Sequence, residues 1–245
     1  MVKAVFFDFD GTLADDSDSI TLALTEACRA VCERWPQLDA TDLAAAYRQF
    51  SNQAWSDYDR YLRHLDSPEA MLASVWRHAL TRQGIDDPQI EKTAADTYWQ
   101  HRLQQCQLYS DTLSVLHDLA SRFPLCLLTN GAPAMQRAKV TATQITALFQ
   151  HIFVGGEFSQ GKPAPQIFEA ALAAVQCKPN EAIHIGDSLM HDIAGARKLG
   201  IHSVWLNRKN SRLQDLTSED SATPDFTITT LTELAECLAK ISSGA

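Results

Sequence analysis

The chain of 245 residues lacks any apolar run long enough for a membrane-spanning helix. Such a helix needs roughly 20 consecutive apolar residues, and no segment approaches that length. The short apolar run near the N-terminus leads directly into acidic residues, which is not the pattern of a secretory signal. We therefore expect a cytoplasmic protein that does not act at a membrane.

Basic charge is also scarce. The chain carries 21 Lys and Arg against 30 Asp and Glu, which gives a formal net charge of −9. A surface with this balance repels the phosphates of nucleic acids and the head groups of anionic lipids. Nucleic acid is therefore excluded as an expected partner.

Cysteine is present six times but never as a C-x-x-C pair. Cys28 and Cys32 lie four residues apart on an expected helix, a spacing compatible with a metal or redox site. No histidine or further cysteine lies nearby to complete a ligand set. Reduced thiols packed in a core are the simpler interpretation.

What the chain does contain, in its first few residues and its second half, is an alternation of strand and helix patterns. Helical periodicity appears at 112–122 and 165–176. Short apolar stretches rich in β-branched and aromatic residues predict strands at 2–7, 124–129, 151–155, 182–186, 202–206 and 225–229. This alternation predicts an α/β fold with a doubly wound parallel sheet.

Residues 15–107 have a different pattern, without a convincing strand. Helices are expected at 17–35, 41–50, 67–83 and 88–105, and four of the five Trp and four of the five Tyr fall in this region. The aromatics are interpreted mainly as the core of a small bundle, with a platform for a planar substrate, formed by one or two of them, as the alternative. We predict a helical domain at 15–107, inserted into an α/β core formed by 1–14 and 108–245.

The stretch "VFFDFDGTLADD" places Asp8 and Asp10 at the end of the first expected strand. Alternate residues of a strand face the same side, and ligands bind at the carboxyl ends of open parallel sheets. Two adjacent carboxylates repel each other. Either a bound Mg²⁺ relieves this repulsion, or one of the two keeps a proton and can act as a general acid. Gly11 suits a sharp bend, and Thr12 can hydrogen-bond within the turn.

Further polar residues follow other expected strands. Thr129 and Asn130 end the strand near 124–129 and offer donors for phosphate oxygens. Lys162, in "GKPAPQIF", can neutralise a bound phosphate. Asp187 follows the strand near 182–186 and suits a Mg²⁺ ligand, while Asp192 either supports that metal or complements the next helix dipole.

Together, Asp8-x-Asp10-Gly11-Thr12, Thr129, Lys162-Pro163 and Gly186-Asp187 through Asp192 resemble the motifs of the haloacid dehalogenase-like (HAD) hydrolases. The helical insert is similar to the subclass I cap of that superfamily. The likeness is to its phosphatase branch, which includes phosphoglycolate phosphatases, N-acylneuraminate-9-phosphatases and nucleotidases.

The resemblance implies a mechanism for a small phosphate monoester. Asp8 would attack phosphorus and form an aspartyl-phosphate, and Asp10 would protonate the leaving alcohol and later activate water. Mg²⁺ would be held by Asp8, the Asp10 carbonyl and Asp187. The phosphate would be bound by Thr129, the Asn130 backbone and Lys162, with Gly11, Thr12 and Asp192 in support.

Other chemistries of the superfamily are less compatible. Dehalogenases lack an aspartate at the position of Asp10, and phosphonatases carry a lysine early in the cap, whereas Lys92 is the only lysine between 15 and 107. A phosphomutase uses the same motifs and stays an alternative. A non-catalytic protein that binds a phosphorylated ligand is a further alternative, although it would typically have lost one of the motif residues.

The sequence narrows the class of substrate but does not identify the substrate. Residues 15–107 carry nine Lys and Arg against fifteen Asp and Glu, which favours a small phosphorylated metabolite over a polyanionic macromolecule. We expect a break in the helices at 49–61 to form a loop that faces the site and offers Asn52, Gln53, Trp55 and Arg60. The oligomeric state is not readable, and a monomer is the default expectation.

Overall fold

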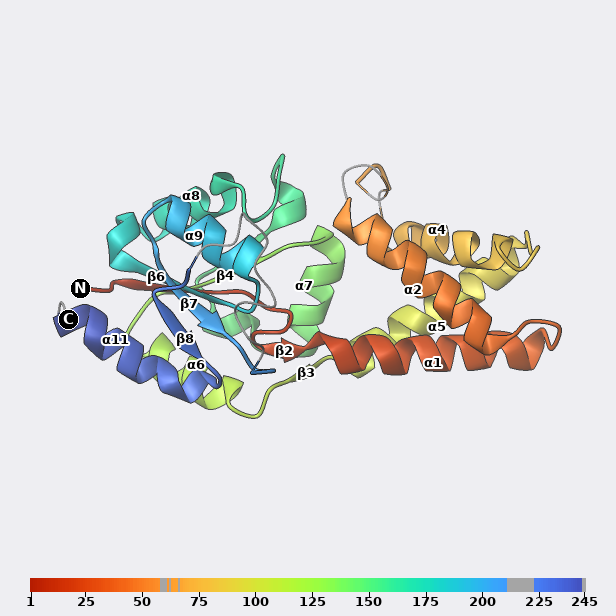
Figure 1. Cartoon of the computed structure of the whole chain (residues 1–245), viewed down its shortest axis with the longest axis horizontal. Coiled ribbons are helices and arrows are strands. Elements are labelled where there is room, and N and C mark those ends of the chain that lie inside the picture. Colours follow the sequence, from red (N-terminus) through yellow and green to blue (C-terminus); the bar gives the residue numbers. More distant parts are fainter. Residues whose placement is uncertain (58–60, 62, 66, 211–222, 244–245) are drawn as a thin grey trace. The chain divides into compact units, whose positions relative to one another are not determined.

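The structure is a computed structural model that describes residues 1–57, 61, 63–65, 67–210 and 223–243. The chain divides into two compact units (Figure 1). We call Met1–Asp15, Leu108–Gln136 and Thr143–Ala245 the α/β unit, and Asp16–Gln107 with Arg137–Ala142 the helical unit. That the helical unit acts as a cap stays a prediction.

The α/β unit is built on a parallel sheet, which among the described residues has six strands in the order β5-β4-β1-β6-β7-β8. The strands are β1 (Ala4–Phe7), β4 (Leu125–Thr129), β5 (His151–Val154), β6 (Ala182–Gly186), β7 (His202–Leu206) and β8 (Phe226–Ile228). Every residue of β1, β4 and β6 is buried, as expected for a parallel sheet with both faces covered. The predicted doubly wound α/β class is confirmed.

Helices cover both faces of this sheet (Figure 1). They are α6 (Thr112–Ala120), α8 (Pro165–Ala174), α9 (Ala194–Lys198), which follows a π-helical turn at Leu189–Ile193, and α11 (Leu234–Ser243). The helix α7 (Pro133–Ala142) begins in the α/β unit, but Arg137–Ala142 belongs to the helical unit. Phe6 of β1, Leu128 of β4 and Phe168 of α8 are fully buried in one core cluster. This apolar layer fixes the strand ends from which the polar motif residues emerge.

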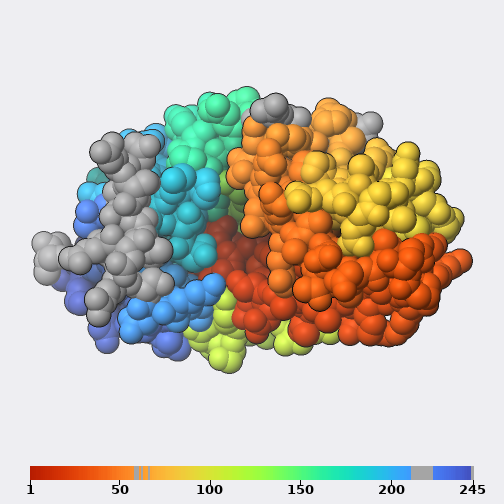
Figure 2. Space-filling model, turned by 45° about the vertical axis from the view of Figure 1, so that its right-hand side comes forward, coloured from red at the N-terminus to blue at the C-terminus, as the bar shows by residue number. Residues whose placement is uncertain are grey.

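The helical unit contains α1 (Asp16–Arg34), α2 (Ala40–Ser56), α4 (Pro68–Thr81) and α5 (Pro88–Gln104). Their starts follow from local chemistry: Asp39, Ser67 and Asp87 each accept a hydrogen bond from a backbone N–H in the first turn of α2, α4 and α5. On the face shown in Figure 2, this unit presents α1 in red-orange, α2 in orange and the following helices in yellow.

The core of the helical unit is aromatic, as predicted. Tyr47, Trp76 and Tyr98 are buried, with ring centroids 4.5 Å apart for Tyr47 and Trp76 and 5.1 Å apart for Tyr47 and Tyr98. Such offset ring pairs add stability beyond the apolar area that they bury. These three aromatic residues therefore serve the packing of the helical unit.

Two sequence-based expectations about this region are wrong. First, α2 does not break near Asn52 but continues to Ser56, so Asn52, Gln53 and Trp55 lie on a helix rather than in a loop, while Arg60 lies outside the described residues. Burial of Ala54 holds the polar turn in helical form, because packing outweighs weak local propensity. Second, the region is not free of strand: β2 (Ala14–Asp15) pairs with β3 (Gln107–Leu108).

The part of the chain that the structure describes holds no helix that is both long and apolar enough to cross a bilayer. All six cysteines are free thiols. Neither Cys28 nor Cys32 belongs to a group of metal-ligating side chains among the described residues.

Candidate active site

Asp8 follows β1 directly, and its backbone N–H donates to the carbonyl of Ile185 in β6 at 2.9 Å. Its side chain is buried, and both carboxylate oxygens accept hydrogen bonds. Lys162 Nζ donates to Oδ1 at 2.7 Å and Thr12 Oγ1 donates to Oδ2 at 3.1 Å. Asp8 is thereby held in one orientation by a residue of its own turn and by a lysine from a distant segment.

The turn after Asp8 depends on Gly11. This residue has φ of +79°, and its N–H donates to the carbonyl of Ala14 at 2.8 Å. A Cβ at this position would collide with the carboxylate of Asp187. Glycine is therefore needed both for the backbone conformation and for the close approach of a second acid.

Asp10 and Thr129 are joined by a residue that the sequence analysis missed. Gln136 of α7 donates through Nε2 to Asp10 Oδ2 at 2.8 Å and to Thr129 Oγ1 at 2.6 Å. The Thr129 hydroxyl in turn donates to the carbonyl of Asn130 at 3.4 Å. The ends of β1 and β4 are thus connected by one amide group.

Asn130 holds the loop that carries Lys162. Its Nδ2 donates to the Lys162 carbonyl at 2.9 Å, and its Oδ1 accepts from the Lys162 N–H at 2.8 Å. A Cβ at Gly161 would collide with the same amide oxygen. The Asn130 side chain therefore positions the lysine, while its backbone stays the part predicted to contact phosphate.

Lys162 is buried and also donates to Asp192 Oδ1 at 2.6 Å. Asp192 has two more partners: Nε2 of His184 lies 2.9 Å from Oδ1, and the N–H of Ser188 donates to Oδ2 at 3.1 Å. With three protein partners on its carboxylate, Asp192 is suited to orient Lys162. His184, a lone polar residue within an apolar strand, is a second contributor that the sequence analysis missed.

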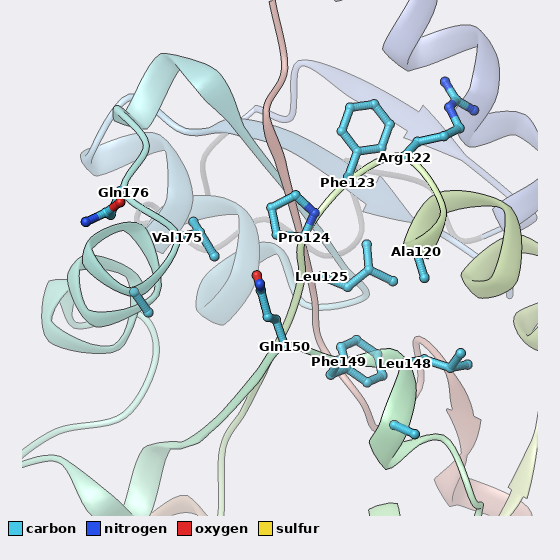
Figure 3. Close-up of a pocket in the computed structure, with 12 residues that line it drawn as sticks. Ala120, Arg122, Phe123, Pro124, Leu125, Leu148, Phe149, Gln150, Val175 and Gln176 are labelled. Carbon is cyan, nitrogen blue, oxygen red and sulfur yellow. The ribbon is translucent and has the colours of Figure 1, made fainter.

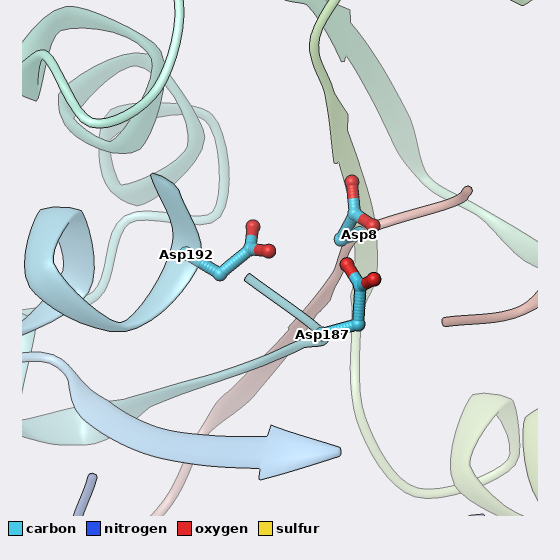
Figure 4. A group of neighbouring side chains, drawn as sticks. All are labelled: Asp8, Asp187 and Asp192. Carbon is cyan, nitrogen blue, oxygen red and sulfur yellow. The ribbon is translucent and has the colours of Figure 1, made fainter. Parts of the chain in front are cut away.

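Asp187 follows β6, and its backbone carbonyl accepts a hydrogen bond from Trp205 Nε1 at 2.9 Å. Oxygens of Asp8, Asp187 and Asp192 all lie within 4.8 Å of one another (Figure 4). We call these three residues, with Asp10 and Lys162, the acid-rich cluster. Its members come from three segments of the sequence and meet at the carboxyl ends of the strands.

The profile of the haloacid dehalogenase-like hydrolases matches residues 2–200. The chain belongs to this family. A phosphoserine phosphatase of Thermus thermophilus is 34% identical over 177 residues, which cover 69% of this chain and 68% of the relative. The rat N-acylneuraminate-9-phosphatase is 28% identical over 98% of this chain and 95% of its own length.

Among solved structures, the HAD-hydrolase YfnB from Bacillus subtilis, which was solved bound to magnesium, superposes with a TM-score of 0.71. It is 21% identical and the match covers 97% of this chain and 98% of that one. At this identity the likeness establishes the fold alone.

The acid-rich cluster of this HAD-like hydrolase has four carboxylates and one ammonium group. Burial raises the pKa of Asp8 to about 7 although Lys162 lowers it, and Asp192 adds to the rise. The side chain of Asp187 is exposed, but its carboxylate lies over Gly11. Desolvation there, with repulsion by Asp8 and Asp192, raises its pKa to about 8. The carboxyl groups of the site therefore resist ionising together against Lys162 alone.

A hard divalent cation fits this donor set. Mg²⁺ prefers carboxylate and carbonyl oxygens and keeps several waters, so it needs few protein ligands. Asp192 accepts from three protein donors, which leaves Asp8 and Asp187 as the side chains suited to hold the ion. In this HAD-like hydrolase such an ion would relieve the repulsion among the neighbouring carboxylates.

The cavity in Figure 3, of about 680 Å³, is not this site. It is lined by Pro124 and Leu125 at the start of β4 and by Phe149 and Gln150 just before β5. These residues lie at the amino ends of the strands, whereas the acid-rich cluster lies at the carboxyl ends. No residue of the acid-rich cluster lines this cavity.

The helical unit contains a second buried ionic group, which we call the cation-rich cluster: Asp16, Arg102 and Lys139. Arg102 Nη2 lies 2.5 Å and Lys139 Nζ 3.1 Å from Asp16 Oδ1. Burial alone would raise the pKa of Asp16, but Lys139 and Arg102 lower it to about 2. The sequence analysis missed this cluster because Lys139 lies 123 residues from Asp16 along the chain.

Proposed function

We propose that this HAD-like hydrolase is a Mg²⁺-dependent phosphatase that hydrolyses a small phosphate monoester through an aspartyl-phosphate on Asp8. The observation that carries the proposal is the environment of Asp8. Lys162 and Thr12 orient its two carboxylate oxygens, and the carboxylate of Asp187 lies within 4.8 Å. The residues that we propose as nucleophile, phosphate-neutralising cation and metal ligand are therefore adjacent.

The names of the relatives support the class of substrate. Both are phosphatases named for a small phosphorylated molecule, N-acylneuraminate 9-phosphate in one case and phosphoserine in the other. They differ in the rest of the molecule, so a sugar phosphate, a nucleoside monophosphate or a phosphoglycolate-like acid all fit the proposal. The phosphate ester is the shared part on which the chemistry acts.

In the first half-reaction an oxygen of Asp8 forms a bond to phosphorus as the bond from phosphorus to the ester oxygen breaks. Asp10 gives its proton to the departing oxygen, which leaves as the alcohol. In the second half-reaction Asp10 takes a proton from water, whose oxygen attacks phosphorus. The bond between phosphorus and Asp8 then breaks, which releases phosphate and restores both acids.

The remaining residues bind and neutralise. Lys162 carries a full positive charge, because Asp192 and Asp8 raise its pKa above the usual range although burial lowers it. Thr129 and the backbone at Asn130 donate to phosphate oxygens. Bound at Asp8 and Asp187, Mg²⁺ would offset charge on the transferring phosphoryl group, which is most of what this chemistry requires of a protein.

Phosphate release from a panel of small phosphate esters, with Mg²⁺ and with EDTA, tests this proposal. We expect turnover with Mg²⁺, a loss of turnover on chelation, and none in Asp8→Asn at any metal concentration. Slow net release that depends on a bisphosphate activator would favour a phosphomutase instead. Folded protein that binds phosphate esters without turning them over would favour a non-catalytic binding protein. The cytoplasmic location and the monomeric state stay predictions from the sequence.

A further inference from the structure

Gln136 is a buried polar residue on the fourth position of α7, and none of the motifs includes it. Only 6% of it is exposed to solvent. A glutamine in such a place must satisfy its amide group within the protein, because an unsatisfied buried donor costs about 1–3 kcal/mol. The hydrogen-bond partners of the Gln136 amide therefore indicate the role of this residue.

Both partners belong to the proposed reaction centre. The amide nitrogen Nε2 carries two hydrogens, and it lies 2.8 Å from Asp10 Oδ2 and 2.6 Å from Thr129 Oγ1. A carboxyl oxygen that carries no proton can only accept hydrogen bonds, so the donor nitrogen of Gln136, and not its oxygen, faces Asp10 Oδ2. One N–H is thus directed to each partner.

The amide group itself is held in place. The N–H of Gln136 donates to the Ala132 carbonyl at 3.0 Å, which fixes its backbone in the first turns of α7. Its side chain passes over Gly131, which has φ of +109° and whose Cβ, if present, would lie 3.4 Å from Gln136 Cγ. Because helix and glycine turn restrict the side chain, it can restrict Asp10 and Thr129 in turn.

We propose that Gln136 is a positioning residue for proton transfer by Asp10. This inference rests on the proposed function. With a lone pair of Oδ2 occupied by the amide of α7, the carboxyl of Asp10 keeps one orientation, and its proton sits on a lone pair directed away from that helix. In the transfer step the O–H bond of Asp10 breaks and the O–H bond of the alcohol forms, as the ester oxygen leaves phosphorus.

The same amide orients the hydroxyl of Thr129. A hydroxyl has a single hydrogen, and by accepting from Gln136 it keeps that hydrogen free to donate elsewhere. Its acceptor is the Asn130 carbonyl at 3.4 Å, a long bond that a phosphate oxygen can replace with little loss. Gln136 therefore aligns the proton donor and a phosphate donor together.

The test is the leaving-group dependence of kcat/KM, measured with Mg²⁺ on a series from p-nitrophenyl phosphate through phenyl phosphate to alkyl phosphates. The parameter kcat/KM reports the steps up to transfer onto Asp8, so it isolates protonation of the leaving group. The variant is Gln136→Met, which keeps the length of the side chain but removes both donors. Gln166→Met, at an exposed position of α8, is the matched control.

In Gln136→Met we expect kcat/KM for alkyl phosphates to fall by about 10- to 100-fold, part of the 10²–10⁴ that general acid catalysis supplies. With p-nitrophenyl phosphate, whose leaving group needs no proton, we expect a change of less than about threefold. Asp10→Ala should steepen the dependence further, and Gln166→Met should leave it unchanged. An equal loss across the series, or no loss at all, would overturn the inference.

A second variant and a second readout guard against a folding defect. Gln136→Leu is a second variant whose apolar side chain has no donor, so it should steepen the same dependence. In protein labelled with ¹⁵N-glutamine, the side-chain NH₂ protons of Gln136 should exchange slowly with water, and faster in Asp10→Ala. Equal exchange in both proteins would contradict the link. If the wild type is active and both Gln136 variants keep its leaving-group dependence of kcat/KM, only this inference is refuted. If the wild type is inactive, the proposed function is refuted and the inference with it.

Discussion

The two buried ionic clusters of this protein use the same groups in opposite proportions. The acid-rich cluster sets four carboxylates against Lys162, and the pKa values of Asp8 and Asp187 rise to about 7 and about 8. The cation-rich cluster sets two cations against Asp16, whose pKa falls to about 2. The first arrangement calls for an additional cation and the second does not.

This difference separates the proposed reaction site from an ion cluster with a structural role. A buried charge is stable only when it is paired and hydrogen-bonded, so Asp16 with two cationic partners is ionised over the whole physiological range. The acid-rich cluster is electrostatically incomplete in the absence of a bound cation, which is a common property of sites that bind ligands and do chemistry. Four predictions test this contrast, from the largest effect to the smallest.

The acid-rich cluster is broken most severely at Asp8. Asp8→Asn keeps the shape of the side chain but removes the nucleophile, so we expect phosphate release to fall by at least about 10⁴-fold. The measurement is release from the best ester of the panel, with circular dichroism as a check of the fold. Asp118→Asn, at an exposed position, is the control and should keep full activity. Residual turnover within tenfold of wild type would remove Asp8 as the nucleophile.

The cation-rich cluster should instead respond in stability. Asp16→Asn leaves the buried charges of Arg102 and Lys139 without their shared carboxylate, and we expect a loss of about 3 kcal/mol in the free energy of unfolding. Urea denaturation measures this. The control is Asp96→Asn, which breaks only the exposed ion pair with Lys92 and should cost about 0.5 kcal/mol or less. Equal losses in the two variants would contradict the structural role of Asp16.

Magnesium should stabilise the α/β unit through the acid-rich cluster. A ligand that binds only the folded state at 100 times its Kd adds about 2.7 kcal/mol, so we expect Mg²⁺ to raise Tm in thermal denaturation. Asp187→Asn removes one proposed ligand and should abolish most of this increase. Asp16→Asn, which lowers Tm by itself, should respond to Mg²⁺ as wild type does. An equal response in Asp187→Asn would place the ion elsewhere.

The smallest expected effect is the loss, at acid pH, of the contribution of Asp16 to the free energy of unfolding. The folded pKa of Asp16, about 2, lies below its ordinary value of 3.8, so its contribution to stability is present above pH 4 and is lost as pH falls through 2. The size is about 2 kcal/mol, at 1.36 kcal/mol for each pKa unit. Urea denaturation at several pH values between 2 and 5 should show the gap between wild type and Asp16→Asn closing as pH falls. A gap that is constant with pH would show that the pKa of Asp16 is not depressed.

Local pattern was sufficient for much of the fold. The predicted strands at 124–129 and 182–186 match β4 and β6 closely, because buried parallel strands are short, apolar and bounded by polar turns. The end of α2 was misplaced, since the burial of Ala54 against other helices has no local signal. The pairing of β2 with β3 was also missed, because two-residue strands separated by some ninety positions leave no periodicity to detect.

The individual residues of the site differ in the same way. Asp8, Asp10, Lys162 and Asp187 stand at strand ends and in motifs that can be read directly. Gln136 and His184 could not be assigned, because a single glutamine on a helix or a histidine within a strand has many possible partners. Their functions depend on which carboxylate each one meets after folding, namely Asp10 and Asp192.

By itself the sequence determined the class of fold, the family and the candidate residues for the proposed chemistry, because strand periodicity, turn residues and motif spacing are local properties of the chain. Only the tertiary structure decided how charge is divided between the two clusters. Desolvation and Coulomb interactions depend on distances in space, and these join Asp8 to Lys162 across 154 residues and Asp16 to Lys139 across 123.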